Sequence, residues 1–275
     1  MSQRLKYISR IKDEFDTVIC GMNGVITRGS SIDAEQVTAL IKIYQSGKKI
    51  MLASNSGQRV GDLFRFLKER GVPMNIFYAM ISAGEIAHFY LKNNHSLGQK
   101  YFPLRQFQSL MMRGLDYTAV TDIRMADFVL AETDMQGLAV EKVMPLLEEA
   151  LRCHLPLVCV GNNISVITED GVCGCAGAVA EQYAMQGGEI IPFGKPDIRI
   201  AAYLSESIIG FDKKRCLVIG DCMATDIRLG NAFKAQTLFL TGGVHQIDEP
   251  TAHKVDELAA GYGLSVDYYT EALQW

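Results

Sequence analysis

The sequence has little of what marks a membrane-spanning, secreted or nucleic-acid-binding protein. No apolar run approaches the ~20 residues that a membrane span requires, and residues 1–15 carry charges where a signal peptide has an apolar region. The seven cysteines include no Cys-x-x-Cys pair, so neither a metal knuckle nor a disulfide framework is indicated. A formal net charge of -4 argues against a nucleic-acid or anionic-membrane surface. We therefore expect a soluble cytoplasmic protein with reduced thiols and with neither nucleic acid nor membrane as a partner.

What the sequence does have is a series of short apolar runs, each ending in a polar turn and followed by a segment of helical spacing. Such runs are too short for stand-alone helices and are typical of buried parallel strands. Strands that alternate with amphipathic helices predict an α/β protein with a parallel sheet. Residues 4–15 also have helical spacing, which predicts a short amphipathic helix before the first strand. The apolar runs are residues 18–20, 49–53, 76–81, 216–219 and 236–240.

The middle of the chain predicts a second α/β unit inserted into the first. Strand and helix candidates alternate between residues 94 and 188 without a low-complexity linker. The pattern of the first sheet is expected to resume at Ile190. We therefore predict a Rossmann-like core domain formed by residues 1–82 and 189–275, with an α/β cap domain formed by residues 83–188.

The first strand and its turn, residues 15–26, are the stretch around which the rest is organised. The strand breaks into Gly21-Met22-Asn23-Gly24, whose two glycines allow backbone amides to approach a ligand. Open α/β sheets bind ligands at the carboxyl ends of their strands. A ligand site is therefore predicted at this turn.

Three further turns bring groups of complementary chemistry to the same edge of the sheet. Ser54 and Asn55 follow the second strand, and Lys195 opens a later helix. With the amides around Gly24, a hydroxyl, an amide and a lysine are the donors that hold a phosphate. Asp221 and Asp226 follow another buried strand, and two carboxylates at this spacing suit a divalent cation with oxygen ligands.

In order and in residue type, these turns resemble the signatures of the haloacid dehalogenase-like (HAD) hydrolases, and within them the class IIA phosphatases with a large α/β (C2) cap. The resemblance spans residues 18–226. It implies that Ser54 is the phosphate-binding hydroxyl, that Lys195 neutralises the phosphate, and that Asp221 and Asp226 form the acidic Mg²⁺ motif. It also implies that the cap covers the site and selects a phosphorylated small molecule.

The first signature departs from that family. The family has Asp-x-Asp-Gly-Val, in which one aspartate is the nucleophile and Mg²⁺ ligand and the other is the general acid/base. Here Gly21 and Asn23 occupy the two places. Gly21 offers no nucleophile, and the Asn23 amide cannot shuttle a proton. We therefore expect the usual covalent mechanism to lack its central step.

Charge leads to the same expectation. A complete site of this family sets four carboxylates against one lysine, and Mg²⁺ balances them. With Asp221, Asp226 and Lys195 remaining, the formal charge is about -1 instead of about -3. Mg²⁺ binding is therefore weakened, and metal-free binding of a phosphate becomes less unfavourable.

Other readings of single residues stay open at this point. Cys20 precedes Gly21, but alternation along the strand points it to the opposite face, where a core thiol is expected. Asp226 could orient the loop that carries Asp221 instead of touching a metal directly. His245 could line the mouth of the site, although an exposed loop histidine is the simpler interpretation.

Three functions fit these residues. The first is a catalytically impaired phosphatase homologue that binds a phosphorylated small molecule or inorganic phosphate. The second is an active Mg²⁺-dependent phosphohydrolase in which water attacks directly, held by Asp221 and a metal. The third is a structural subunit, and the sequence leaves a homo-oligomer open. Gly21 and Asn23 favour the first function over the second.

Overall fold

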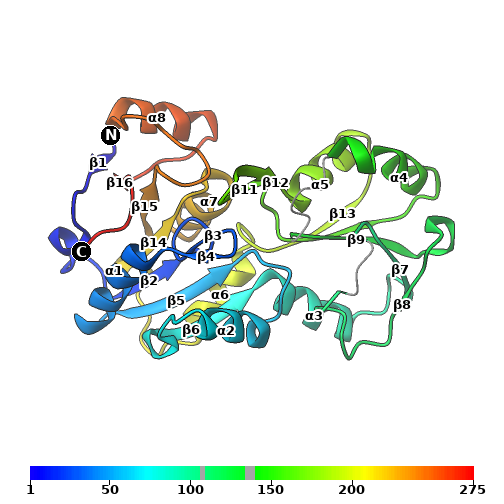
Figure 1. The fold of residues 1–275 in the computed structure, drawn as a ribbon, viewed down its shortest axis with the longest axis horizontal. Helices are drawn as coiled ribbons and strands as arrows, with labels where there is room; N and C mark the ends of the chain where they lie inside the picture. The colour runs from blue at the N-terminus through cyan, green and yellow to red at the C-terminus, as the bar shows by residue number, and fades with distance from the viewer. Residues whose placement is uncertain (106–108, 134–139) are drawn as a thin grey trace.

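A computed structural model of the protein describes residues 1–105, 109–133 and 140–275 and shows an α/β protein built on two parallel sheets (Figure 1). The larger sheet confirms the strand–turn–helix prediction. Each strand lies parallel to its neighbours. The strand order is β1 (Gln3–Arg4), β16 (Tyr268–Thr270), β15 (Gln236–Leu240), β14 (Cys216–Gly220), β2 (Thr17–Cys20), β5 (Lys49–Ser54) and β6 (Phe77–Ser82).

Helices cover both faces of the larger sheet. Val18 and Cys20 of β2 pack in one cluster with Leu40 of α1 (Ala34–Gln45), and α2 (Val60–Glu69) contributes to the same cluster. Ile19 points the other way and packs with Leu204 of α6 (Ile198–Glu206) and with α7 (Arg228–Phe233). A third cluster joins α8 (Ala252–Gly261) to β15 and β16. Burial on both faces explains why the central strands are continuously apolar.

A second parallel sheet forms the other lobe of the molecule, on the right in Figure 1. Its order is β13 (Ile190–Phe193), β10 (Leu157–Val160), β9 (Phe128–Glu132), β7 (Lys100–Pro103) and β8 (Thr118–Ala119). On one face α3 (Ala83–Asn93) packs Ala87 against Phe128 and Val158. On the other, Leu147 of α4 (Val140–Arg152) and Tyr183 of α5 (Ala176–Met185) pack against Val129.

The expectation that the first sheet resumes at Ile190 is wrong. β13 pairs in parallel with β10 of the second sheet, from Leu157↔Ile190 to Val160↔Phe193. A short apolar run predicts a buried strand but does not specify its neighbour. The division into a core and an inserted cap stays a prediction, and we propose that its second boundary lies at Gly194.

The amino-terminal helix predicted over residues 4–15 is also wrong. β1 pairs with β16, and only Ile8–Ile11 form a helix, of the 3-10 type. The apolar residues of this segment still pack in the main core, although the segment does not form the α-helix that their spacing predicts. The other short helical turns are Met74–Ile76, Ile123–Met125, Lys213–Arg215 and the π-helical turn Met223–Ile227. No helix in the described ranges is long and apolar enough to cross a membrane.

Two small hairpins complete the fold and lie between the lobes. β3 (Thr27–Arg28) and β4 (Ser31–Ile32) follow the turn after β2, whereas β11 (Ser165–Thr168) and β12 (Gly171–Gly174) lie between β10 and α5 in the chain. The hairpins touch, because the Gly29 amide donates a hydrogen bond to the carbonyl oxygen of Ile167 at 3.1 Å. Both stand beside the carboxyl ends of the central strands.

Candidate functional site

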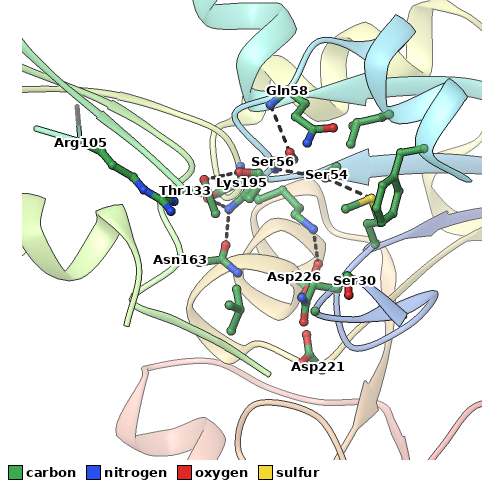
Figure 2. Close-up of a pocket in the computed structure, with 17 residues that line it drawn as sticks. Ser30, Ser54, Ser56, Gln58, Arg105, Thr133, Asn163, Lys195, Asp221 and Asp226 are labelled. Carbon is green, nitrogen blue, oxygen red and sulfur yellow. Dashed lines mark hydrogen bonds and ion pairs between the residues drawn. The ribbon is translucent and has the colours of Figure 1, made fainter. Parts of the chain in front are cut away.

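The carboxyl ends of β2, β5 and β14 and the segment after β13 surround a cavity of about 270 Å³ (Figure 2). The structure brings together at this cavity the five polar side chains singled out for phosphate or metal: Ser54, Asn55, Lys195, Asp221 and Asp226. Ser54 with Asn55 and Asp221 with Asp226 meet because β5 and β14 end at one edge of the larger sheet. Lys195 reaches the same cavity from the end of β13, which belongs to the second sheet.

Lys195 and Asp226 form a buried ion pair at the floor of the cavity. Lys195 Nζ lies 2.7 Å from Asp226 Oδ1, and the residues are 5% and 3% exposed. The second oxygen of Asp226 accepts a hydrogen bond from the Cys222 amide at 3.3 Å. The lysine therefore already has a carboxylate partner without any ligand.

Position 21 faces this ion pair. A Cβ atom on Gly21 would lie 3.1 Å from Asp226 Oδ1 and 3.4 Å from Lys195 Nζ. An aspartate here would thus place its carboxylate against the lysine. Cys20 packs in the core on the opposite side, and burial raises the pKa of its thiol to about 12. Among the described residues that line the cavity, Asp221 and Asp226 are the only carboxylates.

The rest of the first turn is shaped around Asp221. Gly24 has a φ of +77°, and a Cβ there would come within 2.1 Å of the Asp221 carboxylate, so any side chain would displace that group. Asn23 lines the cavity, and its buried Oδ1 has no hydrogen-bond partner in the described structure. An unpaired buried acceptor is costly unless a water or ligand satisfies it.

Asp221 is the most strongly perturbed carboxyl of the site. Its Oδ2 accepts a hydrogen bond from the Val244 amide at 2.8 Å. Burial, and next the negative charge of Asp226, raise its pKa from 3.8 to about 7. A neutral Asp221 reduces the negative charge that an incoming phosphate would meet.

This shift predicts a pH-dependent stability in metal-free buffer. Between the ordinary pKa of 3.8 and about 7, the folded protein keeps the Asp221 proton and the unfolded chain does not. The contribution of Asp221 to the free energy of unfolding should therefore fall as pH rises through that window. Urea unfolding at several pH values, with chelator present, measures the slope. Asp221→Asn should flatten it, and an equal slope in wild type and variant would contradict the assignment.

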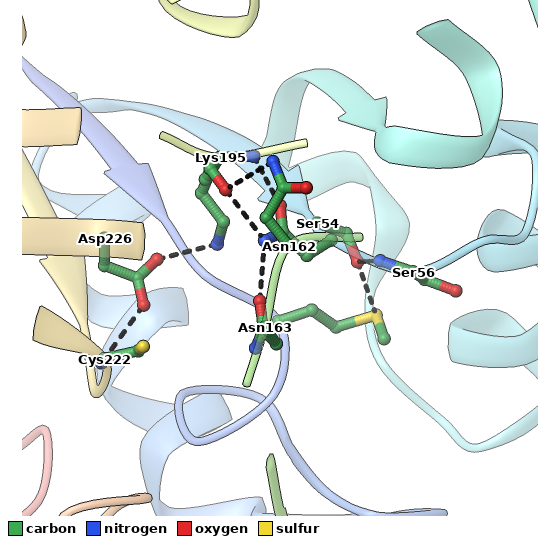
Figure 3. A network of polar contacts seen from close by, with 9 residues as sticks. Ser54, Ser56, Asn162, Asn163, Lys195, Cys222 and Asp226 are labelled. Carbon is green, nitrogen blue, oxygen red and sulfur yellow. Dashed lines mark hydrogen bonds and ion pairs between the residues drawn. The ribbon is translucent and has the colours of Figure 1, made fainter. Parts of the chain in front are cut away.

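Asn55 ties the site together in a way that the sequence does not reveal, and Figure 3 shows the Lys195 segment and the two asparagines of the other lobe, Asn162 and Asn163, beside each other. Its Nδ2 donates to the Lys195 carbonyl at 3.2 Å and to Asn163 Oδ1 at 2.6 Å, and its Oδ1 accepts from the Lys195 amide at 2.6 Å. Asn162 donates to the Lys195 carbonyl at 3.4 Å, and Thr133 donates to the Asn55 carbonyl at 2.6 Å. Asn55 thus positions the lysine loop and joins it to the segment that follows β10.

Ser54 presents its hydroxyl to the cavity. Its Oγ accepts a hydrogen bond from the Ser56 amide at 3.1 Å and donates one to Met22 Sδ at 3.9 Å. A thioether is a weak acceptor, so a ligand oxygen could take this hydrogen bond at little cost. His245 is partly buried, where an exposed loop residue is predicted, and its Nε2 accepts from the Met223 amide at 3.1 Å.

Comparison with known protein families matches one part of the chain to a family model. Residues 192–261, which include Lys195, Asp221 and Asp226, match the family described as HAD-hydrolase-like. A stretch of 100 residues is 31% identical to the glycerol-3-phosphate phosphatase of Gallus gallus. That match covers 36% of this chain and 31% of the chicken enzyme, so it spans about a third of the relative.

Solved structures match the whole fold. A haloacid dehalogenase-like hydrolase from Brucella suis superposes with a TM-score of 0.83 at 24% identity, covering 99% of this chain and 100% of that one. A possible sugar phosphatase of the HAD superfamily from Cytophaga hutchinsonii gives 0.75 at 16% identity, covering 99% and 98%. The glycerol phosphate phosphatase of Mycobacterium tuberculosis, solved with calcium, gives 0.59 at 18% identity, covering 84% and 67%. The predicted fold and its resemblance are confirmed.

Proposed function

From the HAD-like hydrolase fold of this chain, we propose that the protein binds a phosphorylated small molecule or inorganic phosphate and hydrolyses it weakly or not at all. The observation that carries the proposal is the position of Gly21. A side chain at position 21 would point toward Lys195 and Asp226, which is where a nucleophilic carboxylate would lie. Glycine has no side chain and therefore supplies no nucleophile. Covalent phosphoryl transfer requires an oxygen nucleophile in that place.

The acidic residues support a site that does not depend on Mg²⁺. Asp226 is engaged by Lys195 and by the Cys222 amide, and Asp221 by the Val244 amide. The described residues contain no cluster of three or more His, Cys, Asp or Glu that could hold a metal. Two carboxylates whose oxygens already accept hydrogen bonds fit a tightly held Mg²⁺ poorly.

A phosphate could instead be held by groups already on the cavity wall. Ser54 offers a hydroxyl, and Lys195 offers a cation that a phosphate would share with Asp226. Asp221, with its pKa raised to about 7, is neutral in a large fraction of molecules at neutral pH. Lys195 and Asp226 then balance each other, and Arg105 at the cavity wall adds a positive charge that favours an anion.

The alternative is an active phosphohydrolase in which water attacks the phosphorus without a protein nucleophile. The presence of Asp221 and Asp226 favours it, since both lie at the cavity. The chicken and mycobacterial relatives are named as phosphatases. In this mechanism Asp221 would orient the water, and turnover would depend on an added metal ion.

Thermal unfolding with inorganic phosphate, with and without Mg²⁺, tests the proposal alongside phosphate release from a panel of phosphomonoesters. At a phosphate concentration of about 100 times Kd, the unfolding midpoint should rise by roughly 5 °C whether or not Mg²⁺ is present. No phosphate release is expected. Metal-dependent release that disappears in Asp221→Ala would instead establish the alternative.

A further inference from the structure

A second cationic side chain lines the cavity, in addition to the lysine at its floor. Arg105 follows β7 of the second sheet and lines the same cavity as Ser54 and Lys195. Its side chain points into the cavity from the second lobe (Figure 2). The cavity therefore carries positive charge on two walls, and the phosphate site at the floor uses only one of them.

The two cations belong to different ends of the cavity. Lys195 Nζ is directed at Asp226 Oδ1, 2.7 Å away. Figure 2 shows Asp221 and Asp226, the two carboxylates of the described lining, at one end of the group and Arg105 at the other. A phosphate held by Ser54 and Lys195 would therefore have the rest of its ligand between it and Arg105.

The volume and the lining between these ends suit a short organic chain. The cavity of about 270 Å³ is near the lower end of the ~300–1,000 Å³ typical of small-molecule pockets. Gln58 and Asn163 bring amide groups to its wall, whereas Leu63 and Phe66 bring apolar surface. Amides bind hydroxyl groups, and apolar side chains pack against carbon. A phosphomonoester of a few carbon atoms fits this lining.

The chemistry of Arg105 indicates what stands at the far end of such a ligand. A guanidinium stays charged throughout the neutral range and binds a carboxylate or a phosphate through two parallel hydrogen bonds. It has five N–H donors, so a bidentate pair can form beside other contacts of the same side chain. An uncharged ligand end, such as a hydroxymethyl group, would leave this positive charge without a ligand partner.

We propose that Arg105 is a specificity-determining residue that selects phosphomonoesters carrying a second anionic group, either a carboxylate or another phosphate. The inference rests on the proposed function, because it places the first phosphate on Ser54 and Lys195. Each anionic end of the ligand then meets its own cation. Binding of this kind requires neither turnover nor a metal ion.

Matched ligand pairs test the selection by calorimetry in metal-free buffer with chelator, with inorganic phosphate as the reference. 3-Phosphoglycerate and glycerol 3-phosphate differ only in a carboxylate against a hydroxymethyl group. Propane-1,3-diyl bisphosphate and 3-hydroxypropyl phosphate make the same comparison for a second phosphate. In at least one pair the doubly anionic ligand should bind at least about tenfold more tightly, which corresponds to ~1.4 kcal/mol. The pair that shows the preference identifies the second acid.

Arg105→Gln should weaken binding of the preferred ligand at least about tenfold and change the affinity for inorganic phosphate and for the singly anionic match less than about threefold. Arg113→Gln is the matched control, because Arg113 is an exposed arginine of the same lobe outside the described cavity lining. It should change no affinity by more than about twofold. Because Arg105 is exposed, added salt should reduce the preference in wild type and have little left to reduce in Arg105→Gln.

The results separate the two proposals. If inorganic phosphate binds but neither doubly anionic ligand exceeds its match, or if the preference survives Arg105→Gln, the role assigned to Arg105 is wrong and the phosphate site stands. If inorganic phosphate does not bind to the wild-type protein, both proposals are wrong.

Discussion

Restoring both aspartates, Gly21→Asp with Asn23→Asp, is expected to produce Mg²⁺-dependent phosphate release from aryl phosphates at least ~10²-fold above wild type. A Cβ at position 21 would already lie 3.4 Å from Lys195 Nζ and 3.1 Å from Asp226 Oδ1. The new carboxylate would therefore be directed at the ion pair that closes the cavity floor. Asn23 lines the same cavity, so an aspartate there could protonate a leaving group.

The added carboxylates should also change how the protein responds to metal. Without Mg²⁺, the carboxylate of Gly21→Asp enters a buried site that contains Asp221 and Asp226, so the unfolding midpoint should fall. Mg²⁺ should restore it in the double variant and leave wild type unchanged. Gly21→Asn is the matched control, with nearly the same volume and no charge. A folded double variant that shows neither metal response nor turnover would mean that the site differs from an active phosphatase in more than its first turn.

Three of the four turns of the site were predictable because they follow buried strands of the larger sheet, whereas the turn with Lys195 follows β13 of the second sheet. Ser54 ends β5, and Asp221 directly follows β14. A parallel sheet brings such positions together whatever their distance along the chain. The two-face burial of β2 likewise follows from its continuous apolar sequence. Local sequence is sufficient to predict such turns, because the parallel sheet itself brings them into contact.

The sequence does not predict the strand pairings and side-chain contacts that depend on how separate parts of the fold pack together. β13 has the same apolar character as a strand of the first sheet but pairs with β10. Asn55 carries an amide that suits a phosphate, yet its side chain bonds to Lys195 and Asn163. Glu169 looks like any exposed turn residue until the β3–β4 hairpin is placed beside it. The contacts of Asn55 and Glu169 join segments more than one hundred residues apart, and no local pattern encodes them.

The buried ion pair gives the second prediction of large effect. Lys195→Met leaves the Asp226 carboxylate buried without its cation, and Asp226→Asn leaves Lys195 Nζ without its counter-charge. Each variant should lose about 3–5 kcal/mol of unfolding free energy, because removing one partner exposes the full desolvation cost of the other. Urea unfolding in metal-free buffer measures both values. A loss below about 1 kcal/mol in either variant would mean that water reaches the pair.

The same two variants separate stability from ligand binding, because their effects on phosphate affinity should have opposite signs. Lys195→Met removes the buried cation at the cavity floor and leaves Arg105 at the wall, so inorganic phosphate should bind at least about tenfold more weakly by calorimetry. Asp226→Asn frees that cation and removes one negative charge beside it, so phosphate should bind more tightly, by roughly tenfold or more. A mere loss of folding would weaken binding in both variants. If Asp226→Asn also weakens phosphate binding while it remains folded, Asp226 is needed to aim Lys195 at the ligand, and the pair acts as one unit.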